Sequence, residues 1–266
     1  MIYNFPRKKR IQIKITNYLT FSSPNPFSIS VATPGWNGKL YCSTDTETWA
    51  EWTGTEVNAT EEGGIYVLYF VGIGNTKISG GTSYKWTLNG SSISCTGNIE
   101  SLLDYEIVAA GQHPTMENNC YSNMFYSCTS LTTAPSLPAT TLTDYCYSNM
   151  FYNCTNLTTA PSLPATTLAG NCYSSMFRNC TSLTTAPSLP ATTLANYCYS
   201  SMFYSCRSIK LAISQSSEYD KEYRIPKSGD GVTATNAMSR MFAQTGGTFT
   251  GTPSINTTYY TSNTIV

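Results

Sequence analysis

Residues 141–166 read TLTDYCYSNMFYNCTNLTTAPSLPAT, and closely similar copies of this stretch lie on both sides of it. One cysteine recurs at intervals of 26 residues, and a second series of cysteines runs in step with the first. The two series are Cys120, Cys146, Cys172, Cys198 and Cys128, Cys154, Cys180, Cys206. A fixed period of this length indicates a repeat architecture, in which each unit buries its apolar face only by stacking on its neighbours.

Within one copy, the stretch that follows Asp144 has the spacing of a short amphipathic helix. Its apolar residues fall within one arc of a wheel drawn at 100° per residue; they are Cys146, Tyr147, Met150, Phe151 and Cys154. We expect Asp144 to cap this helix, with Asn171 or Gly170 near the same place one copy later. Leu157 and the threonines after it favour a very short strand, which the two prolines of the copy end.

These features together predict an α+β fold whose larger part is a short leucine-rich-repeat solenoid over residues 97–266, with one short helix and one short strand per copy. The period of 26 residues lies within the range of about 20–29 residues for leucine-rich repeats. Caps are expected at both ends of such an array. The expected parts are an N-terminal cap at 97–119, regular repeats at 120–209, an insertion at 210–235 and a degenerate C-terminal cap repeat at 236–266.

The N-terminal part of the chain has a different pattern. Residues 16–96 contain short runs of β-branched and aromatic residues, separated by turns rich in glycine, proline and acidic residues. About seven such runs predict a small β-sandwich domain. Residues 1–15 precede it as a basic arm, with four cations in a row at 7–10. Such an arm is typical of a solvated tail, although it also suits attachment to an acidic partner.

The core pattern Met-Phe-x-x-Cys-x-x-Leu-x-x-x-Pro, which runs from Met150 to Pro161, resembles the BspA-like leucine-rich-repeat family of bacterial surface proteins. The resemblance covers about residues 98–209 well and 236–260 loosely. The chain departs from the family pattern in its extra leading cysteine and its second proline. Family members are associated with adhesion to host proteins and other cells. The layout of repeats behind a small β domain also looks like tail or fibre-associated proteins of gut bacteriophages, which are released by lysis.

Composition narrows the functional classes. The chain has 266 residues, of which 11% are charged, and its 15 basic and 15 acidic residues give a formal net charge of +0. This balance disfavours nucleic acid as a partner. Polarity comes instead from Thr, Ser, Asn and twenty tyrosines, a mixture typical of binding surfaces. The sequence has no run of 18 apolar residues and no apolar signal-peptide core, so we expect neither membrane insertion nor ordinary export.

The cysteines are interpreted as buried free thiols that form part of the core. On a helix, cysteines eight residues apart lie about 12 Å apart, whereas a disulfide requires Cα atoms within about 7 Å. If the helix ends early, a disulfide between cysteines of different copies, such as Cys128 and Cys146, is still an alternative. The spacing does not supply a zinc site, and a pair of His113 with Cys120 is a weak nucleophile candidate. We therefore expect no enzyme activity, catalytic residues, metal or cofactor.

Binding is left as the function, and two rows of residues are candidates for it. Tyr126, Tyr152, Arg178 and Tyr204 occupy one outer position of successive copies, and tyrosine and arginine are common in binding hot spots. Thr132, Thr158 and Thr184 form a second row on the strand face. Solvated helix positions and a β-stabilising ladder are the plainer interpretations of the two rows.

The sequence therefore predicts a non-enzymatic recognition module that binds a surface protein or glycan receptor. We expect it on a virion or bacteriophage tail, outside the cell, with residues 1–96 available for virion attachment or self-association. The alternatives are a bacterial cell-surface adhesin of the BspA type, exported by another route, and a structural decoration or spacer protein of a particle.

Overall fold

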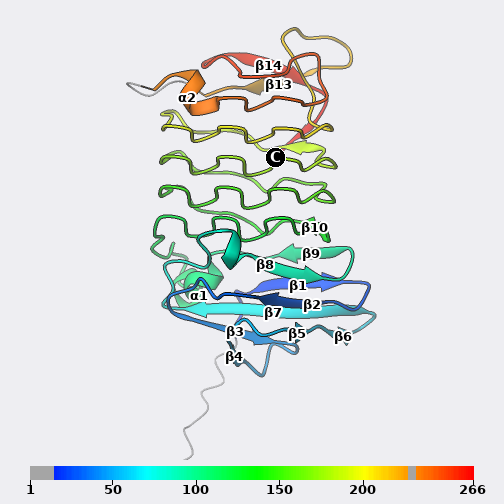
Figure 1. Cartoon of the computed structure of the whole chain (residues 1–266), viewed down its shortest axis with the longest axis vertical. Coiled ribbons are helices and arrows are strands. Elements are labelled where there is room, and N and C mark those ends of the chain that lie inside the picture. The colour runs from blue at the N-terminus through cyan, green and yellow to red at the C-terminus, as the bar shows by residue number, and fades with distance from the viewer. Residues whose placement is uncertain (1–14, 227–231) are drawn as a thin grey trace, which may run out of the picture.

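The computed structural model of the chain describes residues 15–226 and 232–266 (Figure 1). The basic run at 7–10 lies outside the described residues. The helical elements are α1 (Ser101–Ala109), α2 (Ala234–Met238) and a single 3-10 turn, η1 (Thr82–Tyr84). The strands, in chain order, are β1 (Leu19–Ser23), β2 (Ser28–Val31), β3 (Lys39–Ser43), β4 (Ala50–Trp52), β5 (Val57–Asn58), β6 (Thr60–Glu62), β7 (Ile65–Ile73), β8 (Trp86–Asn89), β9 (Ile93–Thr96), β10 (Leu131–Thr133), β11 (Thr185–Ala186), β12 (Leu211–Ala212), β13 (Lys221–Arg224), β14 (Thr258–Thr261) and β15 (Thr264–Ile265).

The N-terminal part is built from two sheets that share an aromatic core. The larger sheet has the order β10-β9-β1-β7-β3-β4, with β6 also paired to β7, and the smaller sheet has the order β5-β2-β8. Trp86 of the smaller sheet contacts Phe21 and Phe70 of the larger one, with ring centroids 5.9 and 5.2 Å apart. These aromatic contacts join the two sheets. Because β10 belongs to the first repeat copy, the larger sheet continues into the repeats.

Helix α1 lies directly against β7, and one glycine makes this contact possible. A Cβ atom at Gly72 would lie 1.6 Å from the carbonyl oxygen of Leu102. No side chain fits at that distance, so the close approach requires glycine. Asn75 fixes the same junction, because its buried side-chain amide donates to the carbonyl groups of Leu102 and Lys39.

The expected α+β fold, a β-sandwich followed by a leucine-rich-repeat solenoid with one helix per copy, is wrong. Only two α-helices occur in residues 15–226 and 232–266, and neither lies in the regular copies. Strands in several small sheets dominate instead. In place of each expected helix the chain makes consecutive turns, with a left-handed residue (φ between 53° and 63°) at every fourth position. These residues are Asn119, Asn123, Ser127, Tyr145, Asn149, Asn153, Asn171, Ser175, Asn179, Tyr197, Ser201 and Ser205.

A left-handed residue every four positions excludes an α-helix, because a helix of L-residues requires negative φ throughout. The predicted cap is also wrong: the Asp144 carboxylate accepts from the backbone N–H of Gly170 in the next copy, at 2.7 Å. Asn171, the alternative cap, is itself a left-handed turn residue. The helix was predicted wrongly because the spacing of the apolar residues fits a period of 3.6 residues as well as a period of four. Pairs of apolar residues every four positions share one face of the turns and also fall within one helical arc.

The turns of successive copies are joined by a regular ladder of backbone hydrogen bonds. Alternate residues donate to the carbonyl three positions earlier and so close each turn, as Met124 does to Tyr121. The residues between them donate to the next copy, as Tyr121 does to Cys146 and Phe125 to Met150. The same ladder joins the next two pairs of copies. We call residues 119–206, held in this way, the repeat stack.

The core of the repeat stack consists of identical side chains placed one above another. The buried tyrosine rings lie parallel, with centroids 5.5–5.8 Å apart, and so do the buried phenylalanine rings, at 5.6–5.7 Å. The second cysteine series adds a polar link, since the thiol of Cys154 donates to the carbonyl of Phe125 at 3.1 Å. Cys180 and Cys206 repeat this bond to Phe151 and Phe177.

The strand expected in each copy is only partly present. Residues 131–133 and 185–186 form β10 and β11, while the copy between them has an isolated bridge from Thr133 to Thr159. Both ends of the repeat stack are covered (Figure 1). At the lower end the backbone N–H groups of Ile78 and Trp86 donate to Cys120 and Met124. At the upper end the carbonyl of Ala237 accepts from Tyr199.

The C-terminal segments complete the upper end. β15 pairs in parallel with β11, and β14 lies between β12 and β13 in a three-stranded sheet. The expected insertion at 210–235 supplies β12, β13 and the start of α2, while its residues 227–231 lie outside the described residues. Asn263 ties the end together, because its side-chain amide donates to the carbonyls of Thr184 and Ser208.

Candidate binding face of the repeat stack

A row of long side chains runs along the outer side of the stacked turns. We call it the Tyr/Arg row, and it consists of Lys85, Tyr126, Tyr152, Arg178, Tyr204 and Arg240. Four of these are the residues that the sequence predicts as a row. The structure places them in direct succession, one from each copy.

Each member of the Tyr/Arg row contacts the next through a ring face. The rings of Tyr126 and Tyr152 are stacked, with centroids 4.7 Å apart. The Arg178 guanidinium lies 5.6 Å from the Tyr152 ring and 4.3 Å from the Tyr204 ring. The stacked rings attract each other, and the guanidinium is attracted to the negative face of each neighbouring ring, so both kinds of contact stabilise the order of the row.

The two ends of the row come from outside the regular copies. The ammonium group of Lys85 lies 5.8 Å from the Tyr126 ring, and the Arg240 guanidinium lies 4.8 Å from the Tyr204 ring. Arg240 also donates to the Tyr204 hydroxyl at 3.1 Å. The copy alignment misses Arg240, because it occupies the left-handed turn position that Ser201 has in the previous copy and reaches the row from there. Lys85 stands before β8 and carries no repeat signal.

The backbone beneath the row is fixed by the turns. Each regular row residue immediately precedes a left-handed residue, as Tyr152 precedes Asn153. The Tyr152 N–H donates to Asn149 and its carbonyl accepts from Ser127 of the previous copy. The row is therefore held from three directions: within its turn, by the neighbouring copy and by its own stacked side chains. Such pre-organised aromatic residues bind with little loss of conformational entropy.

The charged side chains of the Tyr/Arg row are all cations. Between residues 118 and 217 the only carboxylate is Asp144, which is engaged with Gly170. In the part of the chain that the structure describes, the two ion pairs join Lys39 to Glu51 and His113 to Glu100, so neither involves the row. Serine and asparagine occupy the neighbouring turn positions. The face therefore offers three cations and many neutral hydrogen-bonding groups.

The predicted threonine row forms a ladder of hydrogen bonds between successive copies. The Thr184 hydroxyl donates to the Thr158 carbonyl at 3.0 Å, and the Thr158 hydroxyl donates to that of Thr132 at 3.4 Å. The Thr132 hydroxyl donates to Ile93 of β9. Since these hydroxyl protons are used inside the protein, the threonine row has a structural role in joining the copies, and it offers a ligand less than the Tyr/Arg row does.

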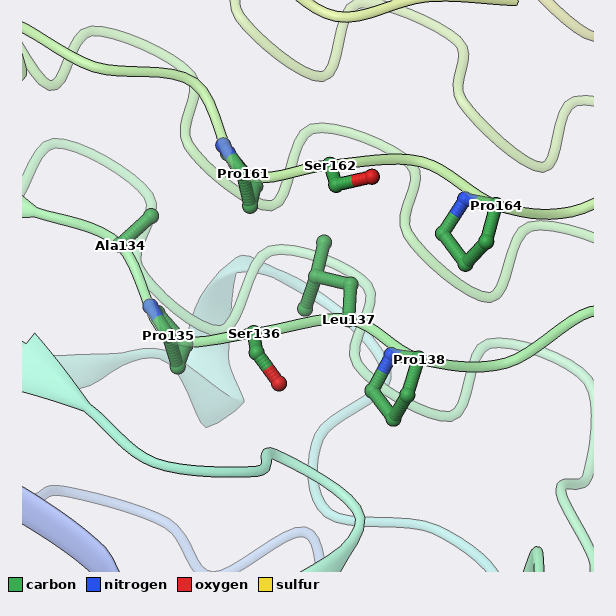
Figure 2. Close-up of a pocket in the computed structure, with 8 residues that line it drawn as sticks. All are labelled: Ala134, Pro135, Ser136, Leu137, Pro138, Pro161, Ser162 and Pro164. Atoms are coloured by element: carbon green, nitrogen blue, oxygen red, sulfur yellow. The ribbon is translucent and has the colours of Figure 1, made fainter. Parts of the chain in front are cut away.

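A groove lies between the Pro-Ser-Leu-Pro segments of two successive copies (Figure 2). It has a volume of about 400 Å³ and is lined by prolines, serines and Leu137. Proline has no N–H to donate to a neighbouring copy. Among the described residues no backbone bond joins 135–138 to 161–164. The groove is open and carries no charged group, which makes it a weaker site than the Tyr/Arg row.

The single histidine lies against a buried carboxylate. His113 Nδ1 is 2.8 Å from the Glu100 carboxylate, which is 1% exposed, beside a hollow of about 270 Å³. Burial raises the pKa of Glu100, and the hydrogen bond from His113 opposes this rise. His113 is therefore placed for an ion pair with Glu100.

The predicted core cysteines all lie inside the repeat stack as free thiols. Burial raises the pKa of Cys146 to about 12 and that of Cys198 to about 11. Thiols with such values stay protonated at neutral pH, and the thiolate is the nucleophilic and metal-binding form. Across residues 15–226 and 232–266, no three His, Cys, Asp or Glu side chains gather as a metal site would require. No helix in those residues has the length and apolar character needed to cross a bilayer.

Comparison of the chain with protein-family models, with curated proteins and with solved structures found no match.

Proposed function

We propose that this chain is a non-enzymatic recognition module that binds an extended receptor on a bacterial or host surface through the Tyr/Arg row. The observation that carries the proposal is the unbroken contact of six side chains along the row. Tyrosine and arginine are among the residue types enriched at binding hot spots, and within residues 15–226 and 232–266 no carboxylate lies within 4 Å of the cations of the row.

The protonated thiols and the engaged histidine support the non-enzymatic part of the proposal. His113 contacts Glu100, and burial raises the pKa of Cys120 well above its ordinary value. A Cys–His nucleophile requires a low thiol pKa and a hydrogen bond between the two groups. Both features oppose the catalytic pair that the sequence offers.

The setting that we propose is the outside of a cell, on a virion or bacteriophage tail. This setting rests on the resemblance of the repeats to BspA-like and phage tail-associated proteins. A module on such a particle needs a rigid face that survives outside the cell. The stack of buried rings and interlocked backbone provides such a face.

The test is binding of the fluorescently labelled chain to a panel of intact gut bacterial strains and epithelial cells. Selective labelling of a few bacterial strains is the expected result. Glycosidase or protease treatment of those cells then shows whether the receptor is a glycan or a protein. Labelling of epithelial cells would favour a host-directed adhesin. Labelling of neither would refute the recognition proposal and favour a structural spacer of a particle.

A further inference from the structure

Arg178 has hydrogen-bonding capacity that the protein does not use. Its Nε is buried and has no hydrogen-bond partner. Among the described residues, side-chain hydrogen bonds from arginine come from Arg224 and Arg240. Arginine carries five N–H donors in a planar fork. The donors of Arg178 that reach the surface are therefore free for an external acceptor.

The position of the Arg178 guanidinium is fixed although its charge is uncompensated. Tyr152 and Tyr204 flank it, at 5.6 and 4.3 Å from their ring centroids. A guanidinium held between two rings loses little freedom when it binds, and its planar fork fits a carboxylate, phosphate or sulfate.

Arg240 provides a second cation on the other side of Tyr204. It lies 4.8 Å from that ring and donates to the Tyr204 hydroxyl at 3.1 Å. The order of the copies places Arg178 below the ring and Arg240 above it. Two arginines separated by one aromatic ring raise the local positive potential, and no carboxylate among the described residues lies within 4 Å of either.

The shape and polarity of the face indicate which kind of anion fits. The ring faces of the row are covered by their stacked neighbours, so a ligand meets ring edges and hydroxyl groups. In the described part of the chain the row hydroxyl with a protein partner is that of Tyr204, which accepts from Arg240, while the hydroxyls of Tyr126 and Tyr152 have none. Protein–protein interfaces concentrate apolar area in their buried centre, and ring edges with hydroxyl groups provide little such area. A polar chain with repeated hydroxyl and acidic groups matches the face better.

We propose that Arg178 and Arg240 form a clamp, centred on Tyr204, for the acidic groups of a linear anionic polysaccharide that lies along the Tyr/Arg row. This inference rests on the proposed recognition function and specifies its ligand class. The carboxylate or sulfate groups of the polysaccharide bind the arginines, and its hydroxyl groups bind the tyrosine hydroxyls farther along the row.

The repeats supply variants that remove charge and follow the pattern of the other copies. Arg178→Tyr places the residue found in the two adjacent copies, and Arg240→Asn places the residue found at the equivalent turn position of two others. Arg207→Thr is the matched control, since threonine stands at that position in the other copies. Arg207 is exposed and has no ring contact with the row.

The experiment measures binding of the full chain to alginate, which carries carboxylates, to dextran sulfate, and to neutral dextran. We expect binding to at least one acidic polymer and none to dextran. Arg178→Tyr/Arg240→Asn should weaken this binding by about tenfold or more, because charge-assisted hydrogen bonds are lost, whereas Arg207→Thr should change it less than twofold. The salt dependence of the double variant should also be weaker.

Equal binding of dextran and the acidic polymers would overturn the clamp, and so would full binding by the double variant or binding to no acidic polymer. The same variants applied to the cell panel separate the two proposals. If the unmodified chain labels cells and the double variant labels them equally, the clamp is wrong while recognition stands. If the unmodified chain labels no cells, the recognition proposal itself fails.

Discussion

Replacement of Asn149 by alanine and by glycine distinguishes the stacked turns from a helix, because the two structures predict opposite signs for the difference in stability between the variants. Asn149 has φ +53° and a half-buried side chain. An ordinary L-residue pays about 1–2 kcal/mol in this left-handed region, whereas glycine pays nothing. The freedom of glycine in the unfolded chain subtracts about 0.4–1 kcal/mol from that advantage. We therefore expect Asn149→Gly to be more stable than Asn149→Ala by about 0.8 kcal/mol, the difference between the midpoints of the two ranges.

The hydrogen bonds at this position affect both variants equally. The Asn149 side chain donates to the Ser148 hydroxyl at 3.3 Å, and both substitutions remove that weak bond. The backbone N–H of Asn149 donates to Ser174 in the next copy, and both substitutions retain it. In a helix the order would be reversed, because alanine is favoured over glycine by about 1 kcal/mol.

Urea unfolding followed by circular dichroism gives the free energy of unfolding of both variants. A higher value for Asn149→Ala than for Asn149→Gly would refute the turn structure and restore the helix. Ser175→Ala and Ser175→Gly repeat the comparison one copy later, where φ is +53°.

Buried groups give three more expected outcomes. Tyr147→Phe should raise the free energy of unfolding by about 1 kcal/mol, because the Tyr147 hydroxyl is buried without a partner. Tyr121→Phe should lower it, because the Tyr121 hydroxyl donates to a carbonyl. Urea unfolding of both variants tests this, and a lower free energy of unfolding in Tyr147→Phe would contradict it. The half-buried Cys42 should react with a thiol reagent at pH 8 before Cys154, which is buried; early modification of Cys154, found by mass spectrometry, would show that the stack opens. Burial raises the folded-state pKa of Glu100, so ionisation of Glu100 does not destabilise the fold below the unfolded-state pKa and destabilises it increasingly as pH rises through the folded-state pKa. Glu100→Gln should therefore stabilise the protein more at pH 7 than at pH 4. Thermal unfolding of the variant and the unmodified chain at both pH values tests this, and a larger gain at pH 4 would refute it.

The stacking of copies was predictable because it depends only on the period. Cysteines at a constant interval require the same surroundings in each copy, and the structure places them in two internal ladders. The local conformation was predicted wrongly, since the spacing of apolar residues such as Met150 and Phe151 fits periods of both 3.6 and 4. The polar residues carried the distinguishing signal. Asn149 and Asn153 stand four apart, and asparagine tolerates the left-handed region better than most residues do.

The Tyr/Arg row was predictable only where the copies are regular. Alignment identifies Tyr126, Tyr152, Arg178 and Tyr204, because residues 26 apart lie above one another in any stacked repeat. Arg240 and Lys85 join the row through tertiary contacts that no alignment of the copies contains. The pairing of Glu100 with His113 arises in the same way, from the path of the chain after α1.

Two double variants, compared on labelled cells, test most directly whether the Tyr/Arg row is the contact surface. Tyr126→Ser/Tyr152→Ser removes two stacked rings from the row, while Thr158→Ala/Thr184→Ala alters the threonine ladder on the strand face. Circular dichroism first confirms that both variants fold. On a strain that the unmodified chain labels, we predict that the tyrosine variant loses most of its binding and the threonine variant keeps it. Full binding by the tyrosine variant together with loss in the threonine variant would contradict the claim.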